Sequence, residues 1–375
     1  MKALFLVFHG FAPHNGISKK IAYQKSALIN NGLDTELCYT AFDETGNQLR
    51  MIDDKILVNY GKGIRAKIMK RIDYSEIVNY VTSNNIKYVY MRSDHNANPC
   101  TIRLVKRLRR VGVVVDMEIP TYPYDREYEQ FGFYDKFTLF IDKMFRRRLA
   151  SYLHRVVTFT NLEEIFSRKT IQISNGIDFS SIKLRSQVPD SSDSFNLIAV
   201  AEIHFWHGFD RVVAGLANYY SKNPGRNVFL HIVGGGIQAE IDLLLKLAKE
   251  GGIEDKVIFY GPLWGDELDN VFEKAHFAIA SLARHRSGIF RIKTLKNREY
   301  TARGIPFIYS ETDEDFDTKP YIMKATADES PIDIESIMKF SESLNISPGD
   351  IRESIESELS WEKQMKKVID EIGSN

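Results

Sequence analysis

The side chains best suited to bind a charged ligand lie in the segment RHRSGIFRIKTLKNREYTARGIP, at Arg284–Pro306. The loop that opens this segment holds three candidates: Arg286, Ser287 and Gly288. The helix expected after it carries three cations and one carboxylate: Lys293, Lys296, Arg298 and Glu299. Such cations suit a diphosphate, and a carboxylate suits the two hydroxyls of a ribose. The alternative is an ordinary charged surface helix in which Glu299 pairs with Arg303, four residues later.

Two glycine-containing turns follow expected strands, at the edge where open α/β sheets bind ligands. Asn15 and Gly16 stand just before a helix, where backbone N–H groups and the helix dipole favour an anion. This turn is not a GxGxxG fingerprint, which argues against an enzyme that depends on NAD or FAD. The turn Gly234–Gly236, with Gly235 at its centre, lets a ligand approach the backbone closely. A plain tight turn is the alternative at both places.

A third turn, HFWHGFDR at His204–Arg211, has two histidines and a tryptophan within four residues. Trp206 offers an apolar platform, and His204 and His207 can donate hydrogen bonds to phosphate or sugar oxygens. The two histidines are also spaced like a metal pair, but no third ligand lies near them in the sequence. A structural cluster of histidine and tryptophan is the remaining alternative.

The composition predicts a two-domain globular chain. Its 375 residues, 43% hydrophobic and 27% charged, are enough to bury two cores. The two cysteines, Cys38 and Cys100, are too few for a disulfide framework and indicate a reducing, cytoplasmic compartment. The opening MKALFLVFHGF is expected to be a buried strand rather than a signal peptide, and no apolar run approaches the ~18 residues that span a bilayer. The sequence therefore predicts a soluble or peripheral protein.

The formal net charge is zero, but the charge is unevenly distributed. Residues 1–170 hold 27 lysines and arginines against 18 aspartates and glutamates, and the remainder holds 23 against 32. Much of the basic excess lies in Lys62–Arg71, Arg103–Arg110 and Lys143–Arg148. These clusters are either solvated helix faces or a peripheral contact with acidic lipids on the inner face of the cytoplasmic membrane. No nucleic-acid-binding module accompanies the charge, so no nucleic-acid partner is expected.

Short apolar runs alternate with amphipathic segments of helix length, an order typical of parallel sheets covered by helices. The first expected strands are Ala3–Phe8, Thr35–Tyr39, Lys87–Met91, Gly112–Met117 and Arg155–Phe159, with helices at Ser18–Asn31, Ile64–Ser83, Thr101–Arg110 and Phe137–Leu153. The second expected strands are Phe195–Ala201, Val228–Val233, Val257–Tyr260, Phe277–Ser281 and Phe307–Tyr309. We therefore expect an α/β protein with two tandem Rossmann-like domains, parallel sheets and a ligand cleft between the domains.

The expected domain boundaries follow from the composition. Residues 1–177 are expected to form the first domain and residues 195–358 the second. The stretch 178–194 is polar and rich in serine, as in a connector. Residues 359–375 contain an amphipathic helix that is expected to pack back on the first domain.

Five segments of the chain carry a family resemblance. They are IQISNGIDF at Ile171–Phe179, HGFDRVVAGLANY at His207–Tyr219, FLHIVGGG at Phe229–Gly236, VIFYGPLWGDELDNVFEKAHFAIASL at Val257–Leu282 and LKNREYTARGIPFI at Leu295–Ile308. In this order they resemble the retaining GT-B glycosyltransferases of the large bacterial (group 1) family that builds capsule, O-antigen and other surface glycans. The second domain matches over nearly its whole length, whereas the first is similar in layout and at Asn15-Gly16.

The resemblance implies a nucleotide-sugar donor held mostly by the second domain, with Glu299 on the ribose and the loop after Gly261 on the base. The donor-binding residues are then Asn15, Gly16, His207, Gly235, Pro262, Leu263, Arg286, Ser287, Gly288 and Glu299. This sequence departs from the family at Arg291, where the sugar-side acid is expected, and at Glu202 and His207, where the diphosphate-binding Arg and Lys are expected. We therefore expect the diphosphate to bind at Lys293, Arg298 or Arg286.

The resemblance also implies sugar transfer with retained configuration and without a metal or other cofactor. The leaving diphosphate accepts the acceptor's proton, so the protein stabilises charge on the phosphates and orients the hydroxyl. In the first domain, His95 and Glu118 are candidates for positioning the acceptor hydroxyl or the sugar, and Tyr122 and Tyr124 for stacking on a sugar face. Each of these four residues has a core or loop role as its alternative. The candidate catalytic residues are His95, Glu118, Lys293 and Arg298.

The sequence thus predicts a glycosyltransferase that moves a sugar from a nucleotide-sugar donor to a glycan or polyprenyl-linked glycan acceptor in bacterial surface polysaccharide biosynthesis. One alternative is a nucleotide-sugar epimerase of the same fold. The other is a non-catalytic nucleotide-sugar-binding protein, which the residues Glu202 and Arg291 suggest.

Overall fold

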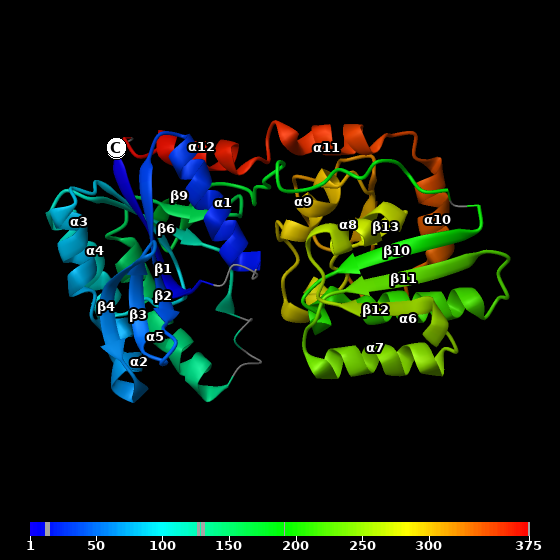
Figure 1. The fold of residues 1–375 in the computed structure, drawn as a ribbon, viewed down its shortest axis with the longest axis horizontal. Helices are drawn as coiled ribbons and strands as arrows, with labels where there is room; N and C mark the ends of the chain where they lie inside the picture. Colours follow the sequence, from blue (N-terminus) through cyan, green and yellow to red (C-terminus); the bar gives the residue numbers. More distant parts are fainter. Residues whose placement is uncertain (12–15, 126–127, 129–131, 191, 374–375) are drawn as a thin grey trace. The chain divides into compact units, whose positions relative to one another are not determined.

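The computed structural model describes residues 1–11, 16–125, 128, 132–190 and 192–373 (Figure 1). Its contacts divide the chain into two compact units. Unit 1 comprises Met1–Ser174 together with Trp361–Asn375, and unit 2 comprises Asn175–Ser360. The C-terminal segment therefore folds with the N-terminal part of the chain.

Unit 1 is built on a nine-stranded sheet with the order β4-β3-β2-β1-β5-β6-β7-β9-β8. Its strands are β1 (Lys2–Gly10), β2 (Asp34–Phe42), β3 (Gln48–Ile52), β4 (Lys55–Gly61), β5 (Tyr88–Arg92), β6 (Val114–Ile119), β7 (Val156–Thr158), β8 (Glu164–Ile165) and β9 (Arg168–Gln172). The strands from β2 to β9 along this order pair in parallel. An antiparallel β3-β4 hairpin and the antiparallel strand β8 complete the two edges.

Helices cover both faces of the unit 1 sheet, which is why its central strands are almost continuously apolar. On one face α1 (Gly16–Asn30) lies beside α12 (Trp361–Asp370), and both share an apolar core with β1 (Figure 1). The other face is covered by α3 (Ser75–Ser83), α4 (Pro99–Arg110) and α5 (Phe133–Ala150). The remaining helix, α2 (Gly63–Ile72), packs on the β3-β4 hairpin.

Unit 2 is built on a six-stranded, fully parallel sheet with the order β12-β11-β10-β13-β14-β15. Its strands are β10 (Ser194–Val200), β11 (Asn227–Val233), β12 (Val257–Gly261), β13 (Phe277–Ile279), β14 (Phe307–Tyr309) and β15 (Ile322–Lys324). Its helices are α6 (Phe209–Tyr220), α7 (Gln238–Glu250), α8 (Gly265–Lys274), α9 (Leu295–Ala302), α10 (Ile334–Ser343) and α11 (Pro348–Glu356). Apolar residues of α6, α7 and α10 pack on one face, and those of α8, α9 and α11 on the other (Figure 1).

The predicted fold class, α/β with two Rossmann-like domains and mainly parallel sheets, is confirmed. One predicted helix, 64–83, is instead the two helices α2 and α3. Asp73 separates them because its carboxylate accepts hydrogen bonds from the backbone N–H and the hydroxyl of Ser75, which competes with a continuous helix. The antiparallel strands of unit 1, and β15, α10 and α11 of unit 2, were not predicted.

Candidate functional site

The carboxyl edge of the unit 2 sheet gathers polar side chains from three neighbouring strands. Parallel strands end at the same edge, so the residues that follow β10, β13 and β14 meet there. The backbone N–H of Ser310, after β14, donates to the carbonyl of Ser281, after β13, at 3.0 Å. The next residue, Leu282, donates to the carbonyl of His207, in the turn after β10, at 2.9 Å. These bonds place three chain segments around one small volume.

One lysine amine at this edge has no carboxylate partner in the described part of the chain. Lys296 Nζ, from α9, lies 2.8 Å from His207 Nε2, and no described residue forms an ion pair with it. His207 Nδ1 accepts the backbone N–H of His204 at 3.2 Å, so the proton of the neutral imidazole lies on Nε2. That nitrogen then donates to the amine, an arrangement that suits an uncharged lysine.

The electrostatics of the pair agree with this geometry. The pKa of Lys296 is lowered to about 7, chiefly because surrounding protein excludes water from the ammonium and further because Arg284 is positive. The pKa of His207 is lowered by burial and by the charge of Lys296, so the imidazole stays neutral. A negatively charged ligand would restore the proton of Lys296, because an anion stabilises the charged form.

Arg284 and two aromatic rings form a platform next to this lysine. The Arg284 guanidinium lies 5.4 Å from the centre of the Trp206 ring, within range of a cation–π contact. The ring of His204 stacks on the same indole with centroids 4.2 Å apart. The rigid turn therefore fixes the position of a second cation at the edge.

A buried carboxylate lies within electrostatic range of the two cations. Glu311, two residues after β14, is only 2% exposed, and neither of its carboxylate oxygens has a hydrogen-bond partner among the described residues. Burial raises its pKa to about 7, although the positive charges of Arg284 and Lys296 oppose the shift. The hydroxyls of Ser281 and Ser310 are buried and likewise lack a partner within the described part of the chain. Buried polar groups without partners are costly, so their concentration at one edge indicates a ligand site.

Glycines let the turn after β11 press against the turn after β10. A Cβ on Gly234, where φ is +131°, would lie 1.8 Å from the carbonyl oxygen of Ala201, and one on Gly236 would lie 2.3 Å from that of Ile203. Only glycine fits this close approach. The middle residue, Gly235, faces Pro262, to which a Cβ would come within 3.5 Å. The predicted donor-binding residues Gly235, Pro262 and Leu263 thus belong to adjacent turns.

The cations that the sequence favoured for the diphosphate are already engaged. Arg298 is fully buried and donates to Asp313 at 2.6 Å and also to Asp315. Lys293 lies 3.6 Å from Asp315 as well. These pairs tie α9 and Lys293, two residues before it, to the segment after β14, so both cations stabilise the fold. Their predicted role at the diphosphate stays untested.

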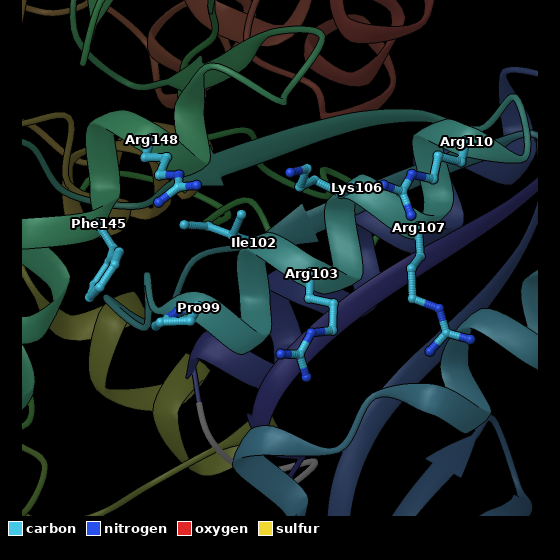
Figure 2. Close-up of a pocket in the computed structure, with 8 residues that line it drawn as sticks. All are labelled: Pro99, Ile102, Arg103, Lys106, Arg107, Arg110, Phe145 and Arg148. Atoms are coloured by element: carbon cyan, nitrogen blue, oxygen red, sulfur yellow. The ribbon is translucent and has the colours of Figure 1, made fainter.

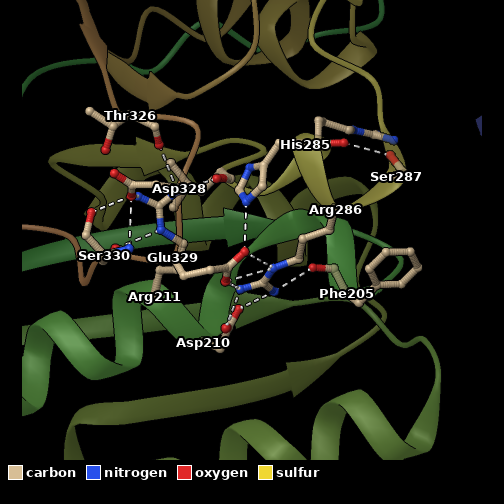
Figure 3. Close-up of polar contacts among 12 residues, drawn as sticks. Phe205, Asp210, Arg211, His285, Arg286, Ser287, Thr326, Asp328, Glu329 and Ser330 are labelled. Atoms are coloured by element: carbon tan, nitrogen blue, oxygen red, sulfur yellow. Dashed lines mark hydrogen bonds and ion pairs between the residues drawn. The ribbon is translucent and has the colours of Figure 1, made fainter.

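Arg286 is held by two carboxylates, as Figure 3 shows. Its guanidinium donates to Asp210 at 2.7 Å and 3.0 Å and to Glu329, which also contacts His285 at 2.8 Å. These bonds lower the pKa of Glu329 to about 2. The hydroxyl of Ser287 donates to the carbonyl of Arg284 at 2.8 Å within the same short turn, which ends at Gly288 in the left-handed region with φ of +70°.

Glu299 pairs with Arg303, as expected for an ordinary charged surface helix. Its carboxylate accepts a hydrogen bond from Arg303 Nε at 3.0 Å, while Arg303 also binds Asp269 at 2.6 Å. Glu299 remains partly exposed and lies one helical turn from Lys296 on α9, so its predicted ribose contact stays a prediction. Arg291, at the expected place of the sugar-side acid, is exposed and paired with Glu314.

In unit 1, Glu118 lies within β6 rather than after it and is fully buried. It pairs with Arg92 and, at 3.6 Å, with Lys20, and accepts hydrogen bonds from Gln24 at 2.6 Å and Tyr90 at 2.7 Å. Burial alone would raise its pKa, but the two cations hold the pKa below its ordinary value. Both carboxylate oxygens are therefore occupied by protein partners.

The other unit 1 candidates form an aromatic cluster. The His95 ring stacks on Tyr124 with centroids 3.8 Å apart, and Tyr122 meets Tyr124 edge to face at 6.5 Å. Tyr124 is buried and donates its hydroxyl to Asp142 at 2.6 Å. Burial, and then the charge of Arg92, lowers the pKa of His95 to about 4, so this histidine is neutral.

The unit 2 candidates thus follow the carboxyl ends of neighbouring strands. In unit 1, His95, Tyr122 and Tyr124 form one cluster, and Glu118 belongs to the network with Arg92 and Lys20. Asn15 lies outside the described residues, and Gly16 is the first residue of α1. Sequence reasoning did not select Lys296, Arg284 or Glu311. Lys296 and Arg284 could have been found from the sequence because they lie in the same basic segment as the chosen cations. Glu311 could have been found because it lies just after an expected strand.

No cluster of three or more His, Cys, Asp or Glu side chains suited to a metal ion was found in the described part of the chain. No helix in that part is long and apolar enough to cross a membrane.

Neither a protein-family model nor a curated protein matches the amino-acid sequence. Solved structures match the fold over the whole chain. A glycosyltransferase from Rickettsia africae ESF-5 has 12% sequence identity and a TM-score of 0.63, with 100% of this chain and 99% of that chain covered. HepE of Anabaena in complex with UDP has 12% identity and a TM-score of 0.66, and WaaG, a glycosyltransferase involved in lipopolysaccharide biosynthesis, has 11% and 0.60; both cover 100% of each chain.

These similarities define the fold. The chain has the GT-B fold of two Rossmann-like domains, and the resemblance drawn from its sequence motifs is confirmed at this level. At such low identity they show the fold alone, so the roles of individual residues rest on the geometry of this chain.

Proposed function

We propose that the protein is a glycosyltransferase that uses a nucleotide-sugar donor, with the diphosphate bound by Lys296 and Arg284. One observation carries the proposal: two cations stand at the carboxyl edge of the unit 2 sheet, and one of them, Lys296, contacts a neutral imidazole instead of a carboxylate. The GT-B fold and the UDP bound to HepE of Anabaena support the choice of ligand.

In the proposed reaction, the bond between the anomeric carbon and the diphosphate oxygen breaks, and the acceptor hydroxyl forms the new bond on the same face of the sugar. The hydroxyl proton passes to the leaving diphosphate, so no metal ion is needed. Charge grows on the diphosphate, and Lys296 and Arg284 stabilise it from fixed positions. Glu299, on the same face of α9 as Lys296, would accept the ribose hydroxyls.

Unit 1 would bind the acceptor. His95 and Tyr122 keep some exposure and are the groups proposed to contact it. Tyr124 and Glu118 are buried and would act as positioning residues, the first by stacking on His95 and the second by holding Arg92. The acceptor class we propose is a glycan or polyprenyl-linked glycan in surface polysaccharide assembly.

A basic pocket on unit 1 supports a contact with anionic lipid. A cavity of about 490 Å³ lies between α4 and α5, and Figure 2 shows basic side chains along it. Its lining combines five cations with apolar groups: Pro99, Ile102, Arg103, Lys106, Arg107, Arg110, Phe145 and Arg148. Among the described residues, no carboxylate forms an ion pair with any of the five. Cations that form no ion pair among the described residues, set beside apolar side chains, suit a phosphate-bearing headgroup.

A second observation supports the same surface. Four large apolar residues of α5 are exposed at spacings of four, three and four: Phe133, Phe137, Phe140 and Met144. Exposed lysines and arginines of the same helix flank this stripe. An apolar stripe with basic borders is typical of a helix that lies in a membrane interface. We therefore place the protein in the cytoplasm, at the inner face of the membrane.

The donor proposal is tested by thermal shift with UDP-, GDP-, dTDP- and CDP-linked sugars, followed by product analysis of the best ligand with and without glycan and polyprenyl-linked acceptors. We expect stabilisation by one nucleotide class and transfer only when the acceptor is present. Turnover of the free donor without an acceptor would indicate the epimerase instead. Binding with no turnover under any condition would indicate a non-catalytic protein, and no binding at all would reject the donor site.

The membrane proposal is tested by sedimentation with phosphatidylcholine vesicles that contain or lack phosphatidylglycerol. The wild-type chain should sediment only with the anionic vesicles, and the double variant Arg103→Glu/Arg107→Glu should remain in solution. Lys246→Glu, which changes an exposed lysine of α7 in unit 2, is the matched control and should bind like the wild type. Equal binding by the double variant would reject the pocket.

A further inference from the structure

Glu311 is a buried charged group of the unit 2 edge to which the proposed function gives no role. It is 2% exposed, and its two carboxylate oxygens have no hydrogen-bond partner within the described part of the chain. The buried hydroxyls of Ser281 and Ser310, whose backbones are hydrogen-bonded to each other at the same edge, also lack a partner among the described residues. A carboxylate in this state needs two hydrogen-bond donors to offset the loss of water.

The chemistry of a nucleotide sugar limits which of its parts can supply those donors. Phosphate oxygens accept hydrogen bonds and carry negative charge, so they would repel an ionised Glu311. Adjacent hydroxyls of the hexose are neutral and offer two O–H donors side by side. The hexose is also bonded directly to the diphosphate, so it lies next to any site that holds the phosphates on Lys296 and Arg284.

From this complementarity we infer that Glu311 is the specificity-determining carboxylate of the donor site, accepting hydrogen bonds from two hydroxyls of the transferred sugar. The inference rests on the proposed function. It adds that the site distinguishes a sugar nucleotide from a bare nucleoside diphosphate: the sugar satisfies Glu311, whereas the terminal phosphate of a nucleoside diphosphate brings a negative charge beside it.

The neighbouring groups support this assignment. Arg284 and Lys296 favour the ionised form of Glu311 that accepts hydrogen bonds, and Ser281 and Ser310 add hydroxyls that can bond to the same sugar. The backbone of Glu311 is fixed as well, because Lys324 Nζ donates to its carbonyl oxygen. The main chain that carries the carboxylate is therefore held in place before a ligand binds, which lowers the cost of ordering on binding.

The test compares two ligands on two variants by isothermal titration calorimetry. UDP and UDP-glucose are the first pair of probes; if another nucleotide class binds in the thermal-shift panel, its diphosphate and hexose conjugate replace them. In Glu311→Gln and Glu311→Ala, affinity for UDP-glucose should fall by about tenfold or more, which is the loss expected for two hydrogen bonds to a charged acceptor. Affinity for UDP should stay unchanged or rise.

A structural role would not produce this pattern. If affinity for both ligands falls together in the Glu311 variants, or if neither changes, the inference is overturned while the donor site itself stands. If the wild-type chain binds no nucleotide of the panel, the proposed function fails first. Glu314→Gln, three residues further along the same segment and paired with the exposed Arg291, is the matched control and should bind both probes like the wild type.

Deoxy analogues identify the hydroxyls. The wild-type chain should bind UDP-2-deoxyglucose more weakly than UDP-glucose if the 2-hydroxyl is one of the two donors, and Glu311→Ala should bind both equally. The same comparison with 3-, 4- and 6-deoxy sugars covers the other positions. An equal loss in wild type and variant at every position would overturn the assignment.

Discussion

Two buried carboxylates near the carboxyl ends of parallel strands, one in each unit, have opposite surroundings. Glu118 of β6 has four protein partners, two cations and two hydrogen-bond donors, whereas neither oxygen of Glu311 has a hydrogen-bond partner among the described residues. The cations hold the pKa of Glu118 below its ordinary value, and burial raises that of Glu311 to about 7. A satisfied buried charge builds the fold, and an unsatisfied one marks a place where a ligand binds.

Removing Glu118 should have the largest effect. Glu118→Ala leaves Lys20 and Arg92 buried without their shared partner, so the free energy of unfolding should fall by about 3–5 kcal/mol. Thermal and urea unfolding followed by circular dichroism measure this, and Glu118→Gln should recover part of the loss because it keeps the shape of the side chain. A loss below about 1 kcal/mol in the alanine variant would mean that the network contributes little, and the contrast between the two carboxylates would disappear.

Glu311→Gln should have the opposite sign. The pKa of Glu311 is about 7 in the folded chain against an ordinary value of 4.5, so between these pH values the folded state holds a proton that the unfolded chain has released. The wild-type chain therefore loses stability through this group as pH rises from 4.5 to 7. At pH 8 the variant should be more stable by about 2–3 kcal/mol, and near pH 4.5 the two should unfold alike.

Thermal melting at the two pH values checks this sign. A variant that is less stable at pH 8, or one whose advantage is the same at both pH values, would show that Glu311 is satisfied after all. In that case the carboxylates of the two units would be alike, and the site would lose its main marker.

Substitution of Lys296 tests whether a bound ligand supplies the anionic partner that this side chain lacks among the described residues. Lys296→Met should weaken UDP binding by about 10–100-fold, because it removes one charged hydrogen bond to the diphosphate. Wild-type affinity for UDP should also fall as pH rises above about 7, where the free lysine loses its proton, and the variant should not show this dependence. Calorimetry across pH 6 to 9 measures both effects.

Lys293→Met serves as the comparison for this experiment. Lys293 already lies 3.6 Å from Asp315, so its loss should affect UDP binding less than that of Lys296. A larger effect at Lys293 would favour the cation that the sequence selected, and would place the diphosphate away from His207.

These residues show how far the sequence reaches. The central parallel strands, the glycine turns and the basic helix α9 were predictable, because periodicity and turn residues are local signals. The antiparallel edge strands of unit 1 and β15 were not predicted. The choice among cations was not, since Arg298 and Lys293 are neutralised by Asp313 and Asp315, which follow them by 15 and 22 residues. Ion-pair partners that only the fold brings together cannot be recognised from the spacing of residues in the sequence.

Glu311 also shows this limit, because the sequence does not reveal that its carboxylate is buried. It stands in the acidic run SETDEDFD after β14, which reads as a solvated loop. The fold buries its carboxylate and leaves that of Glu314 paired with an exposed arginine. A buried carboxylate without a hydrogen-bond partner carries information about function. Whether Glu311 is in that state depends on neighbours from β13, α9 and the turn after β10.

The smallest expected difference between the two units concerns two hydroxyl groups, one in each unit. Thr101 of α4 donates its hydroxyl to the carbonyl of Asn96 at 2.8 Å, and the hydroxyl of Ser281 has no partner among the described residues. Thr101→Val should cost about 1 kcal/mol of unfolding free energy, because the buried carbonyl loses its donor, whereas Ser281→Ala should change it by less than about 0.5 kcal/mol. Urea unfolding separates these values, and calorimetry with UDP-glucose should show a fall of about twofold to tenfold in affinity for Ser281→Ala alone. An equal loss of stability in both variants would mean that the Ser281 hydroxyl already stabilises the fold. The unit 2 edge would then hold fewer polar groups that are available to bind a ligand.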